Sequence, residues 1–186
     1  MEIKKLIDQV LQGNPDAFEG IVRNFQRKIY TFCYFMLGNR QEAEDAAQEV
    51  FLKAYRNLAR YRHEGDDLFL AWLYKIASNH CSTLLQRKKR WYLLMPLFKN
   101  DHNEKSAEQT FSDQAYIPLH LLEGLTTAEK EMIALRVIED RPFEEISAIL
   151  GISSATVRKR FERLRVKLKR NKDRMEGALN EQRYEC

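Results

Sequence analysis

Residues 144–165, EEISAILGISSATVRKRFERLR, contain the signals of two short helices joined by a tight turn. Gly151 can adopt the left-handed conformation that ends the first helix. Ser153 or Ser154 can then accept a hydrogen bond from the first free amides of the second helix. This order of signals predicts a helix–turn–helix.

The second of these helices is predicted to have an apolar side and a basic side. At 100° per residue, four apolar residues fall on one side of this helix, and that side would pack on the preceding helix. They are Val157, Phe161, Leu164 and Leu168. The opposite side exposes short and basic side chains in its N-terminal half, which the major groove of DNA admits. It carries Ala155, Lys159, Arg163 and Arg170, flanked by Thr156, Arg158, Arg160 and Lys167.

A solvated amphipathic helix is the alternative interpretation of this basic side. Such surfaces usually alternate in sign, whereas Glu162 and Asp173 are nearly the only acids here. The charged residues of 121–149 are mostly acidic and those of 156–174 are mostly basic, so the modest net charge of +4 hides a local site for a polyanion. We therefore predict DNA binding, with phosphate contacts that are strong but not sequence-specific.

The rest of the chain is also predicted to be helical. Its 186 residues include only seven Gly and four Pro, and helical periodicity recurs outside residues 96–118. We predict an all-α fold of two small helical domains, residues 1–95 and 119–186, joined by a flexible linker at 96–118. The expected helices cover 3–12, 16–37, 40–61, 67–90, a segment near 117–123, 128–139, 143–150 and 154–174, followed by a frayed tail.

Several classes of protein are excluded by composition and motif. No apolar run is long enough to span a membrane, and the first residues lack a signal-peptide pattern. The cysteines Cys33, Cys81 and Cys186 are odd in number, which indicates free thiols in the reducing cytosol. No catalytic motif or metal-ligand spacing occurs, so we predict no enzyme activity, no metal, no cofactor and no small-molecule substrate. His80 is predicted to be a core histidine rather than a zinc ligand.

The N-terminal half offers two polar surfaces. Residues 40–61 carry many acidic side chains, and two interpretations stay open. The acids could simply stabilise the helix through its dipole, or they could form a docking surface for a basic partner helix. Residues 68–90 are predicted to form a helix with one buried side. The opposite side carries a polar stripe of Lys75, Asn79, Ser82 and Gln86, and the basic run 87–90 follows it. Such side chains suit base edges and phosphates, and the turn at 60–67 could hold an unstacked base.

In this order, four stretches resemble the extracytoplasmic-function sigma factors of the bacterial sigma-70 family. They are DAFEGIVRNFQRKIYTFCYFMLGN, AEDAAQEVFLKAY, AWLYKIASN with its trailing QRKKR, and the helix–turn–helix. The resemblance implies a promoter-specificity subunit that directs core RNA polymerase to a small set of stress-type promoters and initiates transcription. It also implies a dedicated anti-sigma factor, often membrane-anchored, as a further partner beside promoter DNA.

The resemblance also assigns roles to residues. It implies that the largest polymerase subunit binds Asp45, Gln48 and Glu49. Recognition and melting of the −10 promoter element fall to Arg62, His63, Lys75, Asn79, Ser82, Gln86, Arg87 and Lys88. Recognition of the −35 element falls to Ser154, Thr156, Arg158, Lys159, Arg160 and Arg163.

The chain departs from the family pattern at two positions. Thr83 stands where the family usually has Asp, and Lys159 stands where it usually has a small Ser. A stand-alone helix–turn–helix regulator is the alternative function, and it would act as a symmetric dimer on two half-sites. A polymerase-binding adaptor that never reads DNA is a third hypothesis.

Overall fold

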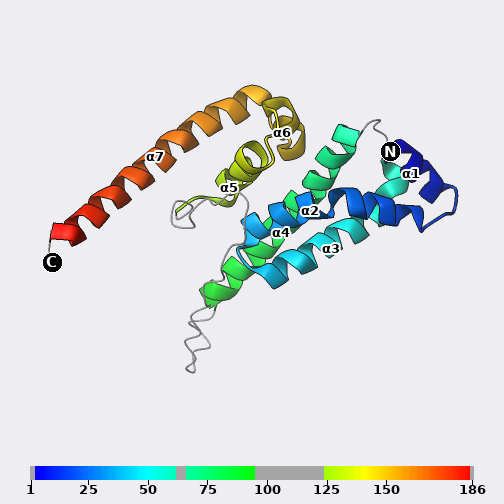
Figure 1. Cartoon of the computed structure of the whole chain (residues 1–186), viewed down its shortest axis with the longest axis horizontal. Helices are drawn as coiled ribbons and strands as arrows, with labels where there is room; N and C mark the ends of the chain where they lie inside the picture. The colour runs from blue at the N-terminus through cyan, green and yellow to red at the C-terminus, as the bar shows by residue number, and fades with distance from the viewer. Residues whose placement is uncertain (1–2, 62–65, 95–123, 185–186) are drawn as a thin grey trace.

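The computed structural model describes residues 3–61, 66–94 and 124–184, and every regular element in these ranges is helical (Figure 1). The all-α prediction is confirmed. The predicted linker at 96–118 and the helix near 117–123 lie outside the described residues. The N-terminal helices are α1 (Ile3–Leu11), α2 (Ala17–Leu37), α3 (Arg40–Asn57), the short 3-10 helix η1 (Leu58–Arg60) and α4 (Asp66–Leu94). The C-terminal helices are α5 (Thr127–Ile133), the π-helical segment η4 (Ala134–Ile138), α6 (Phe143–Leu150) and α7 (Ser154–Tyr184).

Local capping explains where these helices begin and end. Gly38 has a φ of 70°, and its N–H donates to the Tyr34 carbonyl at 2.8 Å, which closes α2. The Asn39 side chain then accepts from the Glu42 amide at 2.9 Å and opens α3. At α5, Thr126 and Glu129 form a reciprocal capping box.

Three predicted helix ends are wrong. The helix predicted over 67–90 continues to Leu94. The helix predicted over 40–61 becomes a tighter 3-10 turn after Asn57, where Leu58 turns inward and is 1% exposed. The tail predicted to be frayed is instead helical, because α7 continues to Tyr184. A single Gly177 costs only about 1 kcal/mol in a helix interior, which the surrounding helix formers outweigh.

The N-terminal helices enclose a core that holds α3 and α4 in place. Ile21, Ile29, Phe32 and Leu73 are inaccessible to solvent. The predicted free thiols of Cys33 and Cys81 are buried in the same core, and their mutual contact together with burial raises the pKa of Cys33. Such thiols are inert, so they act as small apolar groups.

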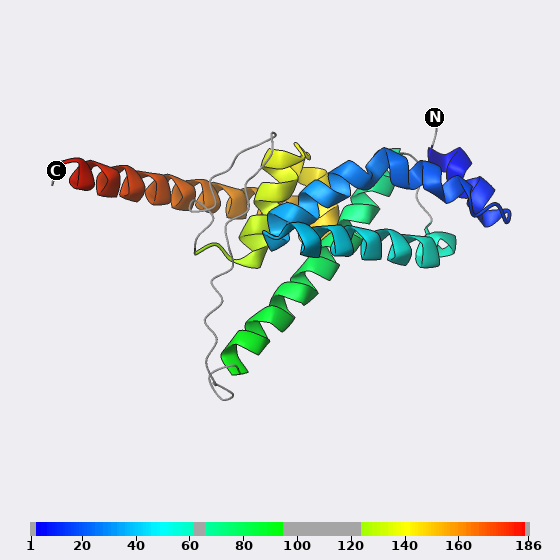
Figure 2. The same ribbon diagram turned by 60° about the horizontal axis from the view of Figure 1, so that its bottom comes forward.

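The C-terminal helices pack directly on this core. Ile146, Ile149 and Val157 belong to the same buried cluster as Phe32, and Phe35 of α2 packs against the cluster around Leu164. Figures 1 and 2 show α5 and α6 beside α2 and α4, with α7 running outward. The sequence carried no signal for this contact between the two halves.

No helix in the described ranges is both long enough and apolar enough to cross a bilayer.

Candidate nucleic-acid interface

The predicted turn of the helix–turn–helix forms between α6 and α7. Gly151 has a φ of 69°, and its N–H donates to the Ser147 carbonyl at 2.9 Å. The Ser147 hydroxyl donates to the Ile152 carbonyl at 2.6 Å, which ties the turn to α6. Of the two candidate caps, Ser153 is the one used: its Oγ accepts from the Thr156 amide at 3.2 Å.

Packing of α7 turns its basic side outward. Val157 is inaccessible and Leu164 is 1% exposed, while Phe161 meets Phe143 of α6 edge-on at 5.6 Å between ring centroids. The predicted apolar stripe is therefore confirmed as the packing side. The exposed side chains on the other side include Lys159, Arg160 and Arg163, and Ala155, Arg158 and Arg170 are exposed as well.

Other polar residues of α7 already have partners within the chain. Arg158 donates to Glu144 at 2.6 Å and lies over the Phe143 ring. Ser154 donates to the same Glu144 carboxylate at 3.3 Å, and Thr156 pairs with the Ser153 hydroxyl at 2.8 Å. Because their partners are exposed, these residues can exchange them for DNA at modest cost.

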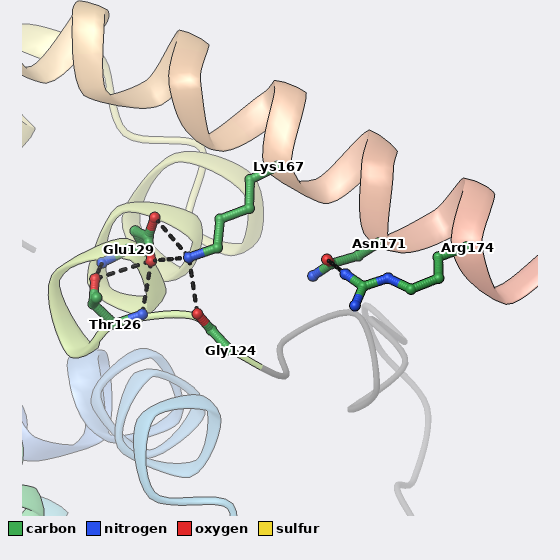
Figure 3. A network of polar contacts seen from close by, with 6 residues as sticks. All are labelled: Gly124, Thr126, Glu129, Lys167, Asn171 and Arg174. Atoms are coloured by element: carbon green, nitrogen blue, oxygen red, sulfur yellow. Dashed lines mark hydrogen bonds and ion pairs between the residues drawn. The ribbon is translucent and has the colours of Figure 1, made fainter.

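Lys167 has a structural role, although it was predicted to flank the basic side of α7. Its Nζ donates to the Gly124 carbonyl at 2.8 Å and to the Glu129 carboxylate at 2.9 Å (Figure 3). Glu129 also accepts from the Thr126 amide at 2.7 Å as part of the capping box. The network holds α7, the helix predicted to bind DNA, against the start of α5.

On α4, the predicted −10 residues divide between two sides of the helix. Asn79 and Arg87 line an open cleft of about 590 Å³ between α3 and α4. The cleft is also lined by Glu49, which was predicted to bind polymerase, and by residues that were not predicted to bind DNA. The latter are Lys53, Asn57, Ile76, His80, Thr83 and Leu84. Its two cations, two amides and partly apolar floor suit a nucleotide with its phosphate.

The prediction of His80 as a core histidine is wrong. The side chain is only half-buried at the wall of the cleft, where Lys53 Nζ lies 2.7 Å from its Nδ1. Burial and the neighbouring Lys53 ammonium lower the pKa of His80. A neutral imidazole accepting at Nδ1 from the ammonium satisfies both groups.

The other side of α4 meets the C-terminal helices. Ser82 donates to Glu131 of α5 at 2.5 Å, and the Lys75 ammonium lies 3.5 Å from where a Cβ at Gly151 would be. The predicted polar stripe is therefore partly covered: Lys75 and Ser82 are half-buried, whereas Asn79 and Gln86 are exposed. The reason is that α4 buries two sides, one against α2 and one against the C-terminal helices.

The C-terminal end of α4 projects beyond the other helices (Figure 2). Arg87, Lys88 and Trp91 are exposed there, with Trp91 at 63%, and Lys88 forms an ion pair with Glu42 at 2.9 Å. Exposed cations beside an aromatic ring suit a nucleic-acid backbone and its bases. Arg62 and His63 lie outside the described residues.

The predicted polymerase-docking residues lie on α3 but do not share one surface. Asp45 and Gln48 are exposed, while Glu49 reaches the cleft shared with α4. Gln48 also borders a mainly apolar groove of about 700 Å³ between α2 and α3. Phe51, Leu52 and Tyr55 line that groove, and Leu52 and Tyr55 are almost half exposed. The polar residues at this groove are Glu44, Arg27 and the amides Gln26 and Gln48, so an amphipathic partner helix could pack there, and both interpretations of the surface stay open.

Within the described ranges, no three histidine, cysteine or acidic side chains gather as a metal site would require.

Comparison with known proteins covers both halves of the chain. Residues 21–91 match the model of sigma-70 region 2, and residues 119–168 match that of sigma-70 region 4. The chain is 35% identical over 182 residues to the ECF RNA polymerase sigma factor SigW of Bacillus subtilis, covering 91% of this chain and 96% of that protein. The chain belongs to the extracytoplasmic-function sigma factors.

One further relative supports this membership, and one solved structure shares the fold. The RNA polymerase sigma-H factor of Pseudomonas aeruginosa is 32% identical over 182 residues, covering 87% of this chain and 89% of that protein. The sigma factor RpoE of Bartonella quintana, solved in complex with the anti-sigma factor NepR, shares the fold with a TM-score of 0.65. It is 20% identical and covers 84% of this chain and 96% of that one. A stand-alone regulator is not favoured, because the family match includes the N-terminal helices as well as the helix–turn–helix.

Proposed function

We propose that this sigma factor brings core RNA polymerase to a small set of stress-type promoters by dividing the work between its two halves. The observation that carries the proposal is the outward basic side of α7, with Lys159, Arg160 and Arg163 exposed beside a rigid turn. Family membership supports a role for that side in binding the −35 element. The chain itself carries out no bond chemistry and acts in the cytoplasm, where polymerase lies.

The N-terminal half is proposed to bind polymerase and the opened −10 element. Asp45 and Gln48 with the adjoining apolar groove support docking on a helical surface of core polymerase. Asn79, Arg87 and the groups of the α3–α4 cleft support capture of one unpaired base with its phosphate. An anti-sigma factor is the expected regulator, as the complex of the Bartonella relative suggests.

Run-off transcription with purified core polymerase on a library of promoter fragments tests this proposal. The wild-type protein should produce new start sites, and Asp45→Arg should abolish them by placing a cation on an acidic docking surface. Asp8→Arg makes the same charge change at an exposed side chain of α1 and should leave transcription intact. Asn79→Ala and Arg163→Ala should retain polymerase binding but lower initiation.

Tight duplex binding without any protein-dependent start site would refute the proposal and favour a stand-alone regulator. If Arg163→Ala and Lys159→Ala both left transcription unchanged, the adaptor that never reads DNA would be favoured instead.

A further inference from the structure

The carboxylate of Glu144 lies beside the basic side of α7 and bridges two residues of that helix. Glu144 is the second residue of α6, and its Oε1 accepts from Arg158 Nη2 at 2.6 Å and from the Ser154 hydroxyl at 3.3 Å. Both donors lie within the first five residues of α7, the part of a recognition helix that reaches base edges. Glu144 itself is not among the predicted DNA-binding residues.

The start of α6 anchors this carboxylate. Glu144 is an acid in the first turn of the helix, where the free backbone amides and the helix dipole favour a negative charge. A hydrogen bond from its own backbone amide, followed by the one from Arg158, lowers the pKa of Glu144. The carboxylate is therefore ionised at neutral pH and attached to α6 as well as to α7.

The Phe143 ring supports the guanidinium of Arg158 as a second partner. Arg158 Cζ lies 5.7 Å from the centroid of this ring, within the range of a cation–π contact. The ring meets Phe161 of α7 edge-on, so it belongs to the packing between α6 and α7. Arg158 is thus held by a carboxylate and a packed ring, although its side chain remains 60% exposed.

The other exposed cations at the start of this basic side lack such support. Among the residues that the structure describes, none pairs with Lys159, Arg160 or Arg163. A side chain that is ordered before it binds loses less rotamer freedom on binding. Arg158 is therefore the cation of this side that is best prepared for a contact of defined geometry.

The bond to Glu144 leaves the guanidinium able to bind a base. Arginine carries five N–H donors in a planar fork, and Glu144 takes one of the two on Nη2. Whichever of these two is used, the other stays next to an N–H of Nη1 or Nε, so one edge of the fork still presents two parallel donors. Such a pair matches O6 and N7 of guanine in the major groove. The exposed ion pair could be broken at modest cost, but a guanine contact does not require this.

We propose that Glu144 is a positioning residue that holds Arg158 in the orientation in which it binds a guanine of the −35 element. This inference rests on the proposed −35 role of Arg158 and deepens it, because it names the base and the residue that sets the orientation. A carboxylate can also accept from the amino group of cytosine, which would make Glu144 itself a base-reading residue. Positioning is favoured because Oε1 of Glu144 already accepts from two residues of α7.

The test selects bound sequences from a duplex library with a randomised centre, using the full-length protein without polymerase. It compares wild type with Glu144→Gln, Arg158→Ala and the double variant. Glu144→Gln keeps the side-chain shape but removes the charge that holds the guanidinium. Asp140→Asn is the control, because it removes one charge from an exposed side chain of the same half, and Asn tolerates its φ of 47°. Net charge changes the affinity for all sequences alike, so the preferences among base pairs are compared.

Wild type should prefer a G·C pair at one position by about tenfold or more, and Arg158→Ala should lose this preference. Glu144→Gln should lower the preference at the same position by about threefold or more, because a neutral amide holds the guanidinium less firmly than a carboxylate does. Asp140→Asn should match wild type. In the Arg158→Ala background, Glu144→Gln should lower no G·C preference further, since its effect passes through Arg158.

An unchanged preference in Glu144→Gln, or a wild-type selection without an Arg158-dependent G·C pair, would overturn the proposal. If Glu144→Gln lowered a G·C preference in the Arg158→Ala background as well, Glu144 would read the cytosine directly and the proposal would be refuted. A merely structural role would weaken binding to every sequence and leave the preferences as they are. Because the selection requires no polymerase, a failed transcription assay would refute the proposed function while leaving the role of Glu144 to be judged by itself.

Discussion

Ser153 should control the stability of the DNA-facing helix although it lies outside that helix. Ser153→Ala removes the side chain that accepts from the Thr156 amide at 3.2 Å and leaves that amide without its cap. Loss of a serine cap costs about 1 kcal/mol. Because the described helices of both halves share one core, we expect them to unfold together, and the melting temperature should fall by about 2–4 °C.

Ser154→Ala is the matched control, one residue further along. Ser154 occupies the first helical position, and its exposed hydroxyl only reaches Glu144 at 3.3 Å. Its loss should cost less than about 0.5 kcal/mol. Thermal unfolding of both variants is measured by circular dichroism at 222 nm. The assignment of the cap is refuted if Ser154→Ala lowers the melting temperature by as much as Ser153→Ala does.

Two further predictions concern side chains whose roles only the structure revealed. The folded protein favours neutral His80, so its contribution to stability should be complete above the unfolded pKa of 6.5 and be lost as pH falls below it. The difference in urea midpoint between pH 7.5 and 5.5 should therefore be smaller in His80→Gln than in wild type, and an equal difference would contradict this. Lys167→Met removes donors to Glu129 and Gly124 and should lower the free energy of unfolding by about 1 kcal/mol, measured by urea denaturation. Lys169→Met, an exposed neighbour on α7, should cost less than half of that, and equal costs would argue against the network.

The division of α4 into two polar sides has a consequence for how the promoter is engaged. Asn79 and Arg87 face an open cleft, whereas Ser82 is held by Glu131. A nucleic-acid strand can therefore reach the cleft side of α4 without displacing a carboxylate of the C-terminal helices, whereas the Ser82 hydroxyl already has a partner.

The sequence by itself determined the helices and the chemistry of their surfaces. Caps and turns act over only a few residues, so Gly38, Asn39, Gly151 and the Thr126 capping box could be located or expected from their neighbours. The apolar stripe of α7 follows from helical spacing in the same way, and the basic side then has to face outward.

The tertiary structure alone decided which polar groups are available. Lys167 and Glu129 are 38 residues apart, and Ser82 and Glu131 are 49 apart, so no local pattern announces either pair. His80 likewise became part of a cleft because α3 supplies Lys53 from 27 residues away. Helical periodicity shows which side of a helix is polar, but only packing determines whether that side meets water, DNA or another helix of the same chain.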